Sequence, residues 1–590
     1  MRSRILIFLL MAIGWYVFIT GILLPIYNGY EYFTMYAATI INKKQRVDAI
    51  RGHLSPHYFH YIKLVVSFAA MLLVLLTGLA VYKINLLCKA ASHCFAIFKK
   101  AIRVWTQNWH DSMVISRCIF AIAMVYTIGR ALYLMHTIPY THDETYTIPN
   151  FILPGPIVST TFYPYPNNHI LFSIVCWPFK YLPLPPEYAF RLPALFAIVI
   201  CCFILYLLFK QLTNDFVASI SISIFVLLLP VMTYSFLARG YGFVFMFFAF
   251  NLYCVINFIK TNNKIYNRLF ILFSVLGLYT VPSFIYCYGS VVIVGFFQLL
   301  RLRQREQLIA FIKSIVITGM VTLLLYVPIM IASGGWKGFL SVIYFGYDES
   351  YGPSLARICR LASDIYLFHF FEQRPLTAIF FVVVFVWLVL YAFTRQKENR
   401  YNTTIALPFA LIGLSIPLLS FIVQHKYPPE RIHGYMSLCI ALLMVLMLGS
   451  LKKAIYKKVV GITAVLAFLG LNIAFALKSA IIHNEIKPDT LAWEITDKLF
   501  ENRNSGTDTC YSFSVFFITT IQMKWALAQK DIVVYQVEPN SPSTRLFDLN
   551  EKYPWIITSY KYPLSDSNKL RAEYIPILTR KEAVLWKRKQ

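Results

Sequence analysis

An adjacent acidic pair, Asp143-Glu144, lies in the stretch of this sequence that is richest in residues able to do chemistry. The stretch runs from Pro139 to His169 and follows an apolar segment. Only 27 of the 590 residues are Asp or Glu, so two acids together beside an apolar run are informative. Ionisable groups at the mouth of a membrane protein are candidates for function. Two ordinary surface acids in a solvated loop would give the same local pattern, and the rest of the chain has to decide.

Other polar residues lie in loops that the apolar pattern assigns to the same side as the acidic pair. They are His169, Arg191, Arg239, Tyr241, His425, Lys426, Arg431 and His433. A carboxylate can accept the proton of an attacking hydroxyl as a general base. An arginine fork binds a phosphate with two hydrogen bonds and keeps its charge at any pH. The combination suits sugar transfer from a membrane-anchored sugar phosphate, although transporters and flippases also place Arg and Asp within membranes.

Several of these residues also have a purely structural interpretation. Arg239 and Arg431 could extend along the bundle to reach the membrane surface. His169 could begin a helix without any chemical role. Arg191 begins an apolar run, where anchoring residues are common, so a structural role is favoured for it.

Membrane helices are the elements that must position these residues. The chain is 58% hydrophobic and 14% charged, whereas soluble proteins carry about 25% charged residues. Its net charge is +27, but the basic residues lie mostly in short loops between apolar runs. There they indicate orientation and attraction to anionic lipids, and nucleic acid is not an expected partner. The cysteines, mostly within apolar runs, show no metal-ligand or disulfide spacing.

About thirteen apolar segments are predicted to cross the membrane. They are 5–25, 62–82, 117–137, 191–209, 216–234, 243–259, 267–281, 284–300, 311–332, 376–394, 404–424, 436–451 and 459–478. The segment 169–182 is short and broken by prolines, so we expect an interfacial or re-entrant helix that does not cross. The basic loops place Asp143 and Arg431 on the outer side and Lys264 and Lys452 on the cytoplasmic side.

Residues 479–590 differ in kind from the rest of the chain. The segment 489–501 is predicted to be an amphipathic helix. Strands are predicted at 531–537, 554–560 and 583–589. This pattern indicates a small α/β domain, which the number of spans places outside the membrane.

Short motifs connect the candidate residues along about residues 110–450. In chain order they are Asp143-Glu144, Tyr165-Pro166-Asn167-Asn168-His169, Arg191-Leu192-Pro193, Ala238-Arg239-Gly240-Tyr241 and Tyr427–Arg431 (YPPER). In combination they resemble the GT-C glycosyltransferases, in particular the group that includes the lipid A aminoarabinose transferase and the protein O-mannosyltransferases. The resemblance implies an α-helical polytopic membrane fold and an inverting transfer from a polyprenyl-phosphate sugar. The acceptor would be a hydroxyl group on a lipid, a glycan or a protein.

The resemblance also implies roles for individual residues. The acidic residue of the first large outer loop, Asp143, would activate the acceptor hydroxyl, with Glu144 beside it as the second catalytic candidate. The residues expected to bind the donor phosphate or substrate are His169, Arg239, Tyr241 and Arg431. The expected location is a bacterial inner membrane, with the site on the periplasmic side. A glycan polymerase or ligase would share the arginines and depend less on the acidic pair, so it stays as an alternative.

These residues do not require a cofactor, and whether a divalent metal ion is bound is left open. Relatives that bind a metal often carry a second acidic motif soon after the Arg-Gly-Tyr stretch. Here Gly242-Phe243-Val244-Phe245 follows without an acid, and Asp348-Glu349 is the remaining candidate.

The sequence thus predicts three parts. Residues 1–110 hold two extra N-terminal spans and a basic cytoplasmic segment. Residues 111–478 form a GT-C-like transmembrane catalytic domain. Residues 479–590 form the small α/β domain on the periplasmic, or otherwise extracytoplasmic, side.

Overall fold

The structure is a computed structural model that describes most of the membrane part and pieces of both ends. The described residues are 8, 11–12, 15, 18–19, 23–40, 55–83, 106–107, 109–161, 163, 167–332, 347–348, 363, 366–367, 369–371, 373–393, 400–424, 426–427, 430–482, 488–502, 510–512, 520–521, 523, 554–559, 567–580 and 583–589. Most of the predicted span 5–25 and all of the predicted strand 531–537 lie outside them. Glu349 and His425 lie outside them as well.

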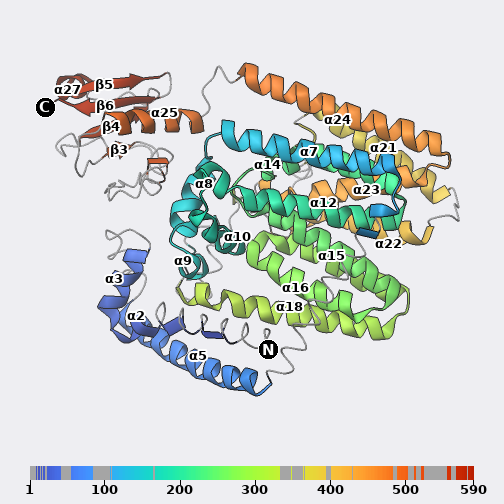
Figure 1. Cartoon of the computed structure of the whole chain (residues 1–590), viewed down its shortest axis with the longest axis horizontal. Coiled ribbons are helices and arrows are strands. Elements are labelled where there is room, and N and C mark those ends of the chain that lie inside the picture. The colour runs from blue at the N-terminus through green and yellow to red at the C-terminus, as the bar shows by residue number, and fades with distance from the viewer. Residues whose placement is uncertain are drawn as a thin grey trace.

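Apolar helices packed side by side form the body of the molecule (Figure 1). Seven helices among the described residues are long and apolar enough to cross a membrane. They belong to α5 (Pro56–Tyr82), α7 (Val114–Thr137), α12 (Leu192–Leu212), α15 (Tyr241–Thr261), α17 (Ile285–Arg301), α18 (Arg305–Ala332) and α24 (Ala454–Ile482). Further apolar helices are α13 (Asp215–Leu227), α16 (Lys264–Thr280), α21 (Arg374–Phe393), α22 (Arg400–Gln424) and α23 (Met436–Ser450). The chain is therefore a mostly helical integral membrane protein.

Every predicted span except 5–25 coincides with one of these helices, although the number that cross a bilayer stays a prediction. One predicted span needs correction. The segment 216–234 is interrupted after α13, and a separate short helix, α14 (Leu229–Tyr234), follows. Pro230 in the first turn of α14 has no N–H for a continuous helical ladder, which explains the break at Leu228.

The interior of the bundle is built from α12, α13, α15 and α23, whose side chains are largely buried. The outer helices α5, α18 and α24 expose many apolar side chains, as expected for helices that face lipid. α12 and α15 each have 21 residues. At 1.5 Å per residue they are about 30 Å long, close to the thickness of the hydrocarbon core.

The two ends of the bundle match the two sides that the charge pattern predicts. α15 begins beside Arg239 and ends just before Lys264, so these residues lie at opposite ends. Arg303 lies with Lys264, because the neighbouring Gln304 amide donates to the Ile259 carbonyl oxygen at 3.5 Å. Which compartment each end faces stays a prediction.

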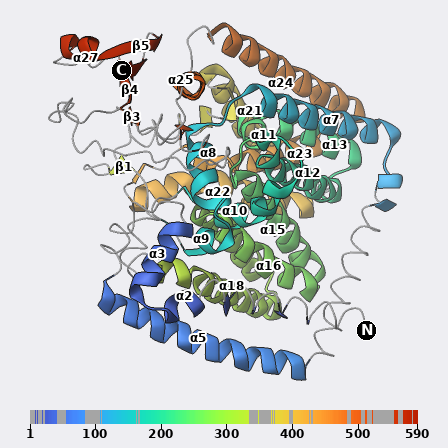
Figure 2. The same cartoon turned by 60° about the vertical axis from the view of Figure 1, so that its left-hand side comes forward.

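The Pro139–His169 stretch folds into short helices at one end of the bundle (Figure 2). They are α8 (His142–Thr147), the π-helical turn η3 (Ile148–Ile152) and α9 (Pro156–Thr161). α10 (Ile170–Cys176) and the 3₁₀ turn η4 (Trp177–Tyr181) follow. Together α10 and η4 measure roughly 20 Å, which is shorter than the hydrocarbon layer. Their length agrees with the prediction that 169–182 does not cross.

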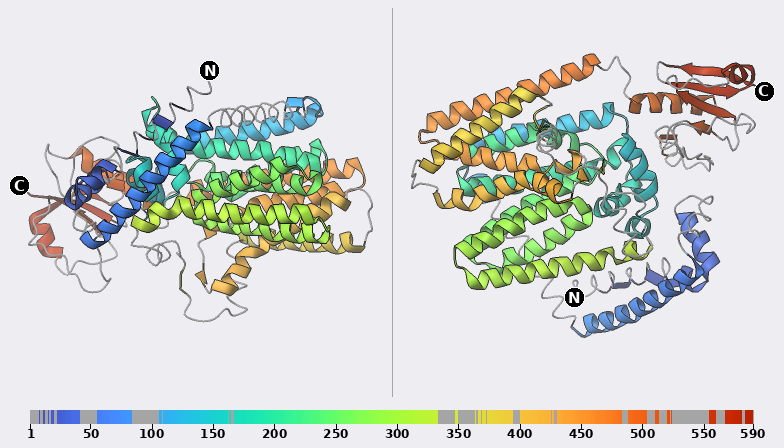
Figure 3. Two further views of the ribbon diagram at one scale, coloured as in Figure 1. Left: turned by 90° about the horizontal axis from the view of Figure 1, so that it is seen from below. Right: turned by 180° about the vertical axis from the view of Figure 1, so that it is seen from behind.

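The C-terminal part forms a separate layer beyond the same end of the bundle (Figure 3). It contains α25 (Pro488–Glu501), β3 (Cys510–Ser512), β4 (Trp555–Ser559), α27 (Ser567–Glu573), β5 (Tyr574–Thr579) and β6 (Ala583–Arg588). The described strands pair in the order β3-β4-β6-β5, with β3 parallel to β4 and the other pairs antiparallel. The predicted helix 489–501 and the predicted strands 554–560 and 583–589 are confirmed.

Strand β5 was missed because its sequence contains Pro576. Proline cannot donate to a strand ladder and is tolerated on edge strands or at bulges. β5 pairs with β6 alone among the described strands, and its register shifts between Pro576 and Leu578.

Candidate active site

Helix α8 begins with a capping box that fixes the acidic pair. Thr141 is the N-cap, and the Glu144 carboxylate accepts hydrogen bonds from the Thr141 backbone N–H at 2.9 Å and from its hydroxyl at 3.1 Å. The pattern Thr-x-x-Glu is the sequence signature of this motif. Successive residues on a helix point about 100° apart, so Asp143 and Glu144 face different surroundings.

Glu144 forms a fully buried ion pair with Arg191 at the start of α12. Its Oε1 accepts from the Arg191 Nε at 2.8 Å and from the Ala238 backbone N–H at 2.6 Å. Its Oε2 accepts from the Arg191 Nη2 at 2.7 Å. Both oxygens accept hydrogen bonds from neighbouring groups, and the catalytic role expected for Glu144 stays a prediction.

Arg191 is saturated as well. Its Nη1 donates to the carbonyl oxygens of Met135 and Ile138, and its Nη2 donates to that of Pro139. The ring of Tyr140 lies 4.6 Å from the guanidinium carbon. The structural role favoured for Arg191 agrees with this placement, although the reason is a buried network that joins α7, α8 and α12 instead of an anchor at the membrane surface.

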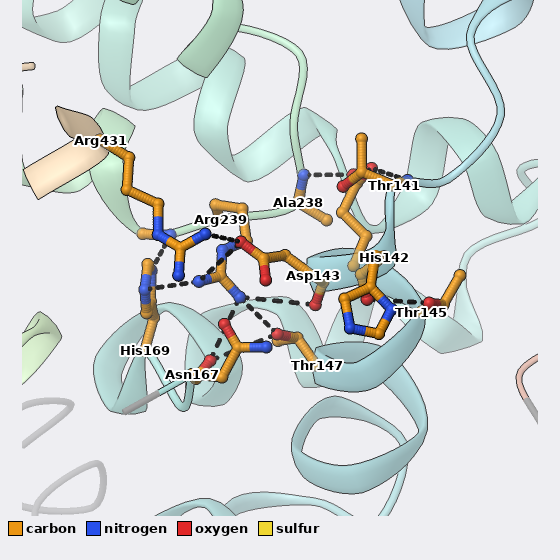
Figure 4. Close-up of polar contacts among 12 residues, drawn as sticks. Thr141, His142, Asp143, Thr145, Thr147, Asn167, His169, Ala238, Arg239 and Arg431 are labelled. Atoms are coloured by element: carbon orange, nitrogen blue, oxygen red, sulfur yellow. Dashed lines mark hydrogen bonds and ion pairs between the residues drawn. The ribbon is translucent and has the colours of Figure 1, made fainter. Parts of the chain in front are cut away.

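Asp143 faces the open side of the same helix, and 26% of its side chain is exposed. Its Oδ2 lies 3.1 Å from the Arg431 Nη1 and 3.6 Å from the Arg239 Nη2 (Figure 4). Burial alone would raise the pKa of Asp143, but the two guanidinium groups outweigh it and hold this pKa below the ordinary value of an aspartate. The carboxylate is therefore charged and held between two cations.

Arg239 follows α14 and lies buried beneath Asp143. Its Nη1 donates to the Thr147 hydroxyl at 2.7 Å and to the Asn167 carbonyl oxygen at 3.2 Å. Its Nε is also buried and has no hydrogen-bond partner among the described residues. A buried donor left unpaired is costly, so this N–H would gain from an acceptor beside it.

His169 provides a second donor beside the Arg239 guanidinium. The Gly240 backbone N–H donates to its Nδ1 at 2.6 Å, so Nδ1 carries no proton and the neutral ring carries its proton on Nε2. Burial lowers the pKa of His169, and the charges of Arg239 and Arg431 lower it further, which keeps the ring neutral. The protonated Nε2 lies 3.2 Å from the Arg239 Nη2, which is also a donor. An oxygen atom beside both groups would accept from both.

Gly240 permits this close approach. A Cβ atom at this position would lie 2.8 Å from the His169 Nδ1 and 2.9 Å from the Thr280 Cγ2. Only a residue without a side chain lets the backbone N–H reach the imidazole.

Tyr241 and Arg431 occupy contrasting positions. Tyr241 is buried and packs edge-on against His169, with ring centroids 4.8 Å apart, and its ring lies 5.9 Å from the Arg239 Cζ. Tyr241 therefore packs against both His169 and Arg239. Arg431 comes from the short turn η6 (Glu430–His433), and 43% of its side chain is exposed. It therefore approaches Asp143 from the open side.

Three contributing residues were not assigned a role from the sequence. Thr147 lies one helical turn after Asp143, and that spacing could have shown that both face the same side. Asn167 is part of a motif that was noted, but its backbone carbonyl, which contacts Arg239, leaves no trace in sequence. His142 precedes Asp143, and burial lowers its pKa more than the neighbouring carboxylate raises it.

Among the described residues no cluster of metal-ligating side chains surrounds Asp143, and dependence on a divalent metal stays a prediction. No three or more His, Cys, Asp or Glu side chains among them gather where they could hold one. The carboxylate already faces two cationic side chains, which disfavour a further cation. Asp348, the other acidic candidate, lies in β1 (Tyr347–Asp348), whose backbone pairs with that of β2 (Lys426–Tyr427).

No protein-family model matches this sequence, and a search of curated proteins finds no match. Among solved structures, the chain is similar to ArnT from Cupriavidus metallidurans bound to undecaprenyl phosphate, with 7% identity, a TM-score of 0.49 and coverage of 80% of this chain and 97% of that chain. The apo state of ArnT from the same organism gives 8% identity, a TM-score of 0.48 and coverage of 79% and 97%. At this identity and TM-score, the likeness transfers no activity, substrate or residue role to this chain.

Proposed function

We propose that this protein is a membrane glycosyltransferase that moves a sugar from a polyprenyl-phosphate donor to a hydroxyl acceptor. The observation that carries the proposal is one partly exposed carboxylate, Asp143, held between the guanidinium groups of Arg239 and Arg431 at one end of a membrane bundle. The carboxylate can act on a hydroxyl group, and the arginines can bind a phosphate.

The donor phosphate is best accommodated beside Arg239. Its Nη2 and the protonated Nε2 of His169 are two donors 3.2 Å apart, and a phosphate oxygen would accept from both. Arg431 would contribute a second charged fork from the open side. The polyprenyl chain would lie in the surrounding lipid, against exposed apolar side chains of outer helices such as α18.

The reaction would begin with the donor phosphate drawing Arg239 and Arg431 away from Asp143. Losing these cations raises the basicity of the carboxylate. Asp143 would then accept the proton of the acceptor hydroxyl group. The oxygen of that hydroxyl group would attack the anomeric carbon at the same time. A new C–O bond forms to the acceptor, and the bond from the anomeric carbon to the phosphate oxygen breaks with inversion. The polyprenyl phosphate departs with the bonding electron pair, and its added charge is stabilised by the arginines.

The acceptor class and the compartment are the parts of the proposal that rest on the sequence alone. The acceptor is proposed to be a hydroxyl group on a lipid, a glycan or a protein. The site is proposed to face the periplasm of a bacterial inner membrane, because the basic loops lie at the opposite end of the bundle.

A donor panel tests the proposal. The purified protein in lipid nanodiscs is incubated with undecaprenyl-phosphate-linked sugars, each with a mixture of hydroxyl acceptors, and release of undecaprenyl phosphate is followed. We expect release with at least one donor, dependent on an acceptor and lost in Asp143→Asn. Movement of an intact sugar-lipid across a vesicle membrane, without release, would instead identify a transporter and overturn the proposal.

A further inference from the structure

Helix α25 carries a tryptophan that contacts the membrane bundle instead of its own domain. Leu491, Ile495 and Leu499 recur every four residues and form the core of the C-terminal domain with β4 and β6. Trp493 points away from that face and packs against the core of the bundle. Its indole Nε1 donates to the Tyr140 carbonyl oxygen at 3.0 Å. α25 lies beside α8 in Figure 1, so this contact is made next to the proposed active site.

Tyr140 transmits this contact to the buried ion pair. Its ring lies 6.2 Å from that of Trp493, measured between centroids, and 4.6 Å from the guanidinium carbon of Arg191. The ring is almost fully buried. A displacement of Tyr140 would therefore disturb the packing of Arg191 against Glu144.

The backbone before Asp143 is held at consecutive residues. The carbonyl oxygens of Ile138 and Pro139 accept from Arg191, and the Thr141 N–H donates to Glu144. The Tyr140 carbonyl oxygen lies between them, and Trp493 donates to it. The hydrogen bonds to the neighbouring residues are made by side chains of the membrane domain, whereas Trp493 belongs to the C-terminal domain.

We propose that Trp493 is a positioning residue, through which the C-terminal domain holds the segment 138–141 and thereby orients Asp143 between its two arginines. The effect on turnover rests on the proposed function, while the effect on the segment does not. The role of the domain is then to stabilise one conformation of the site.

Two substitutions separate the indole hydrogen bond from the packing of the ring. Trp493→Phe keeps an aromatic ring and removes the donor, whereas Trp493→Ala removes both. Trp586→Phe is the matched control, because the Trp586 Nε1 donates to the Thr558 hydroxyl at 2.9 Å within the sheet of the same domain. It removes an indole hydrogen bond without touching the membrane part.

Amide hydrogen exchange of the full-length protein in nanodiscs measures the segment directly. One hydrogen bond corresponds to about three- to tenfold in an opening equilibrium. We expect exchange in the peptide that covers 138–147 to rise by about that factor in Trp493→Phe, further in Trp493→Ala, and not in Trp586→Phe. Equal exchange in Trp493→Ala and Trp586→Phe would overturn the proposal.

Turnover gives a second readout that a merely structural role would not move. With a donor found in the panel, kcat per folded molecule should fall in the order Trp493→Phe, Trp493→Ala, while binding of undecaprenyl phosphate changes little. The acid limb of the pH profile should also move to higher pH, because a less well placed Asp143 is held less tightly by the arginines. Unchanged kcat and pH profile in Trp493→Ala would overturn the proposal. Absence of turnover in the wild-type protein would count against the proposed function alone, since the exchange measurement still decides the role of Trp493.

Discussion

Two neighbouring acids on one helical turn, Asp143 and Glu144, occupy opposite environments. Glu144 is fully buried and accepts hydrogen bonds from Thr141, Arg191 and Ala238. Asp143 is partly exposed and faces Arg239 and Arg431 at 3.6 Å and 3.1 Å. Each acid is paired with arginine, so pairing alone does not distinguish them.

The difference lies in whether the donors of the arginine are used up. A guanidinium offers five N–H donors. In Arg191 all five donate, two of them to the Glu144 carboxylate and three to backbone carbonyl oxygens. Arg239 has a buried Nε without a partner among the described residues, and its Nη2 faces another donor on His169. The Arg191 guanidinium therefore offers no further donor, whereas Arg239 keeps an Nε–H that no described residue uses.

The largest expected effect comes from removing the exposed acid. Asp143→Asn keeps the shape of the side chain and removes the base. General-base catalysis contributes about 10²–10⁴ in rate, so kcat should fall by that factor. Donor affinity should not fall, because the phosphate no longer competes with a carboxylate for Arg239 and Arg431. Donor turnover in normally inserted, folded variants measures this. Wild-type turnover in Asp143→Asn would end the proposed mechanism.

Removing the buried acid should affect stability. Glu144→Gln leaves Arg191 charged and without its counterion in the interior, and breaking such a pair costs about 3–5 kcal/mol in the free energy of unfolding. Thermal unfolding in detergent should show a clear fall in Tm. The control is Glu501→Gln, which breaks an exposed pair with Lys498 and should leave Tm nearly unchanged. Equal Tm values for Glu144→Gln and the wild type would remove the distinction between the two acids.

Arg431 sharpens the comparison, because it is the more exposed of the two arginines that face Asp143. Arg431→Ala removes a charged contact to phosphate and should weaken undecaprenyl phosphate binding by about 10- to 100-fold. Arg431→Lys should recover only part of the affinity, because an ammonium cannot form the planar fork. Binding titrations in nanodiscs measure both. Full recovery by lysine would show that charge alone matters at this position.

The smallest effect is on pH dependence. The pKa of Asp143 is lowered below its ordinary value of 3.8, so its base form, and with it kcat/KM, should be lost only as the pH falls through this lowered pKa. The stability that Asp143 contributes is likewise present above the unfolded pKa and is lost as the pH falls through the folded one. Arg431→Ala removes one of the lowering charges, so the acid limb should move to higher pH. A limb that stays in place would show that Arg431 does not influence the carboxylate.

The sequence predicted the helices better than it predicted the site. Hydropathy located the spans, because an apolar run needs no distant partner to identify it. The break near Pro230 and the edge strand around Pro576 were misjudged, since neither the interruption of a helix nor the edge of a sheet is set by hydropathy alone.

The sequence could not predict which of the two acids, Asp143 or Glu144, is buried. The answer depends on Arg191, 47 residues after Glu144, and on Ala238, 94 residues after it. The capping box at Thr141 was readable from its spacing and would have assigned one carboxylate of the pair to the helix terminus. The donor pair of His169 and Arg239 depends on the tautomer that Gly240 imposes, which only the folded backbone determines.

These separations also set an order in time during synthesis. Arg191 follows Glu144 by 47 residues, which takes a ribosome roughly 2–10 s at about 5–20 residues per second. Arg431 follows Asp143 by 288 residues, which takes roughly 15–60 s at the same speed. The buried pair can close while most of the chain is still unmade, and the second arginine reaches Asp143 only after α22 has been inserted. A nascent chain therefore carries the buried Glu144–Arg191 pair well before it carries both arginines that face Asp143.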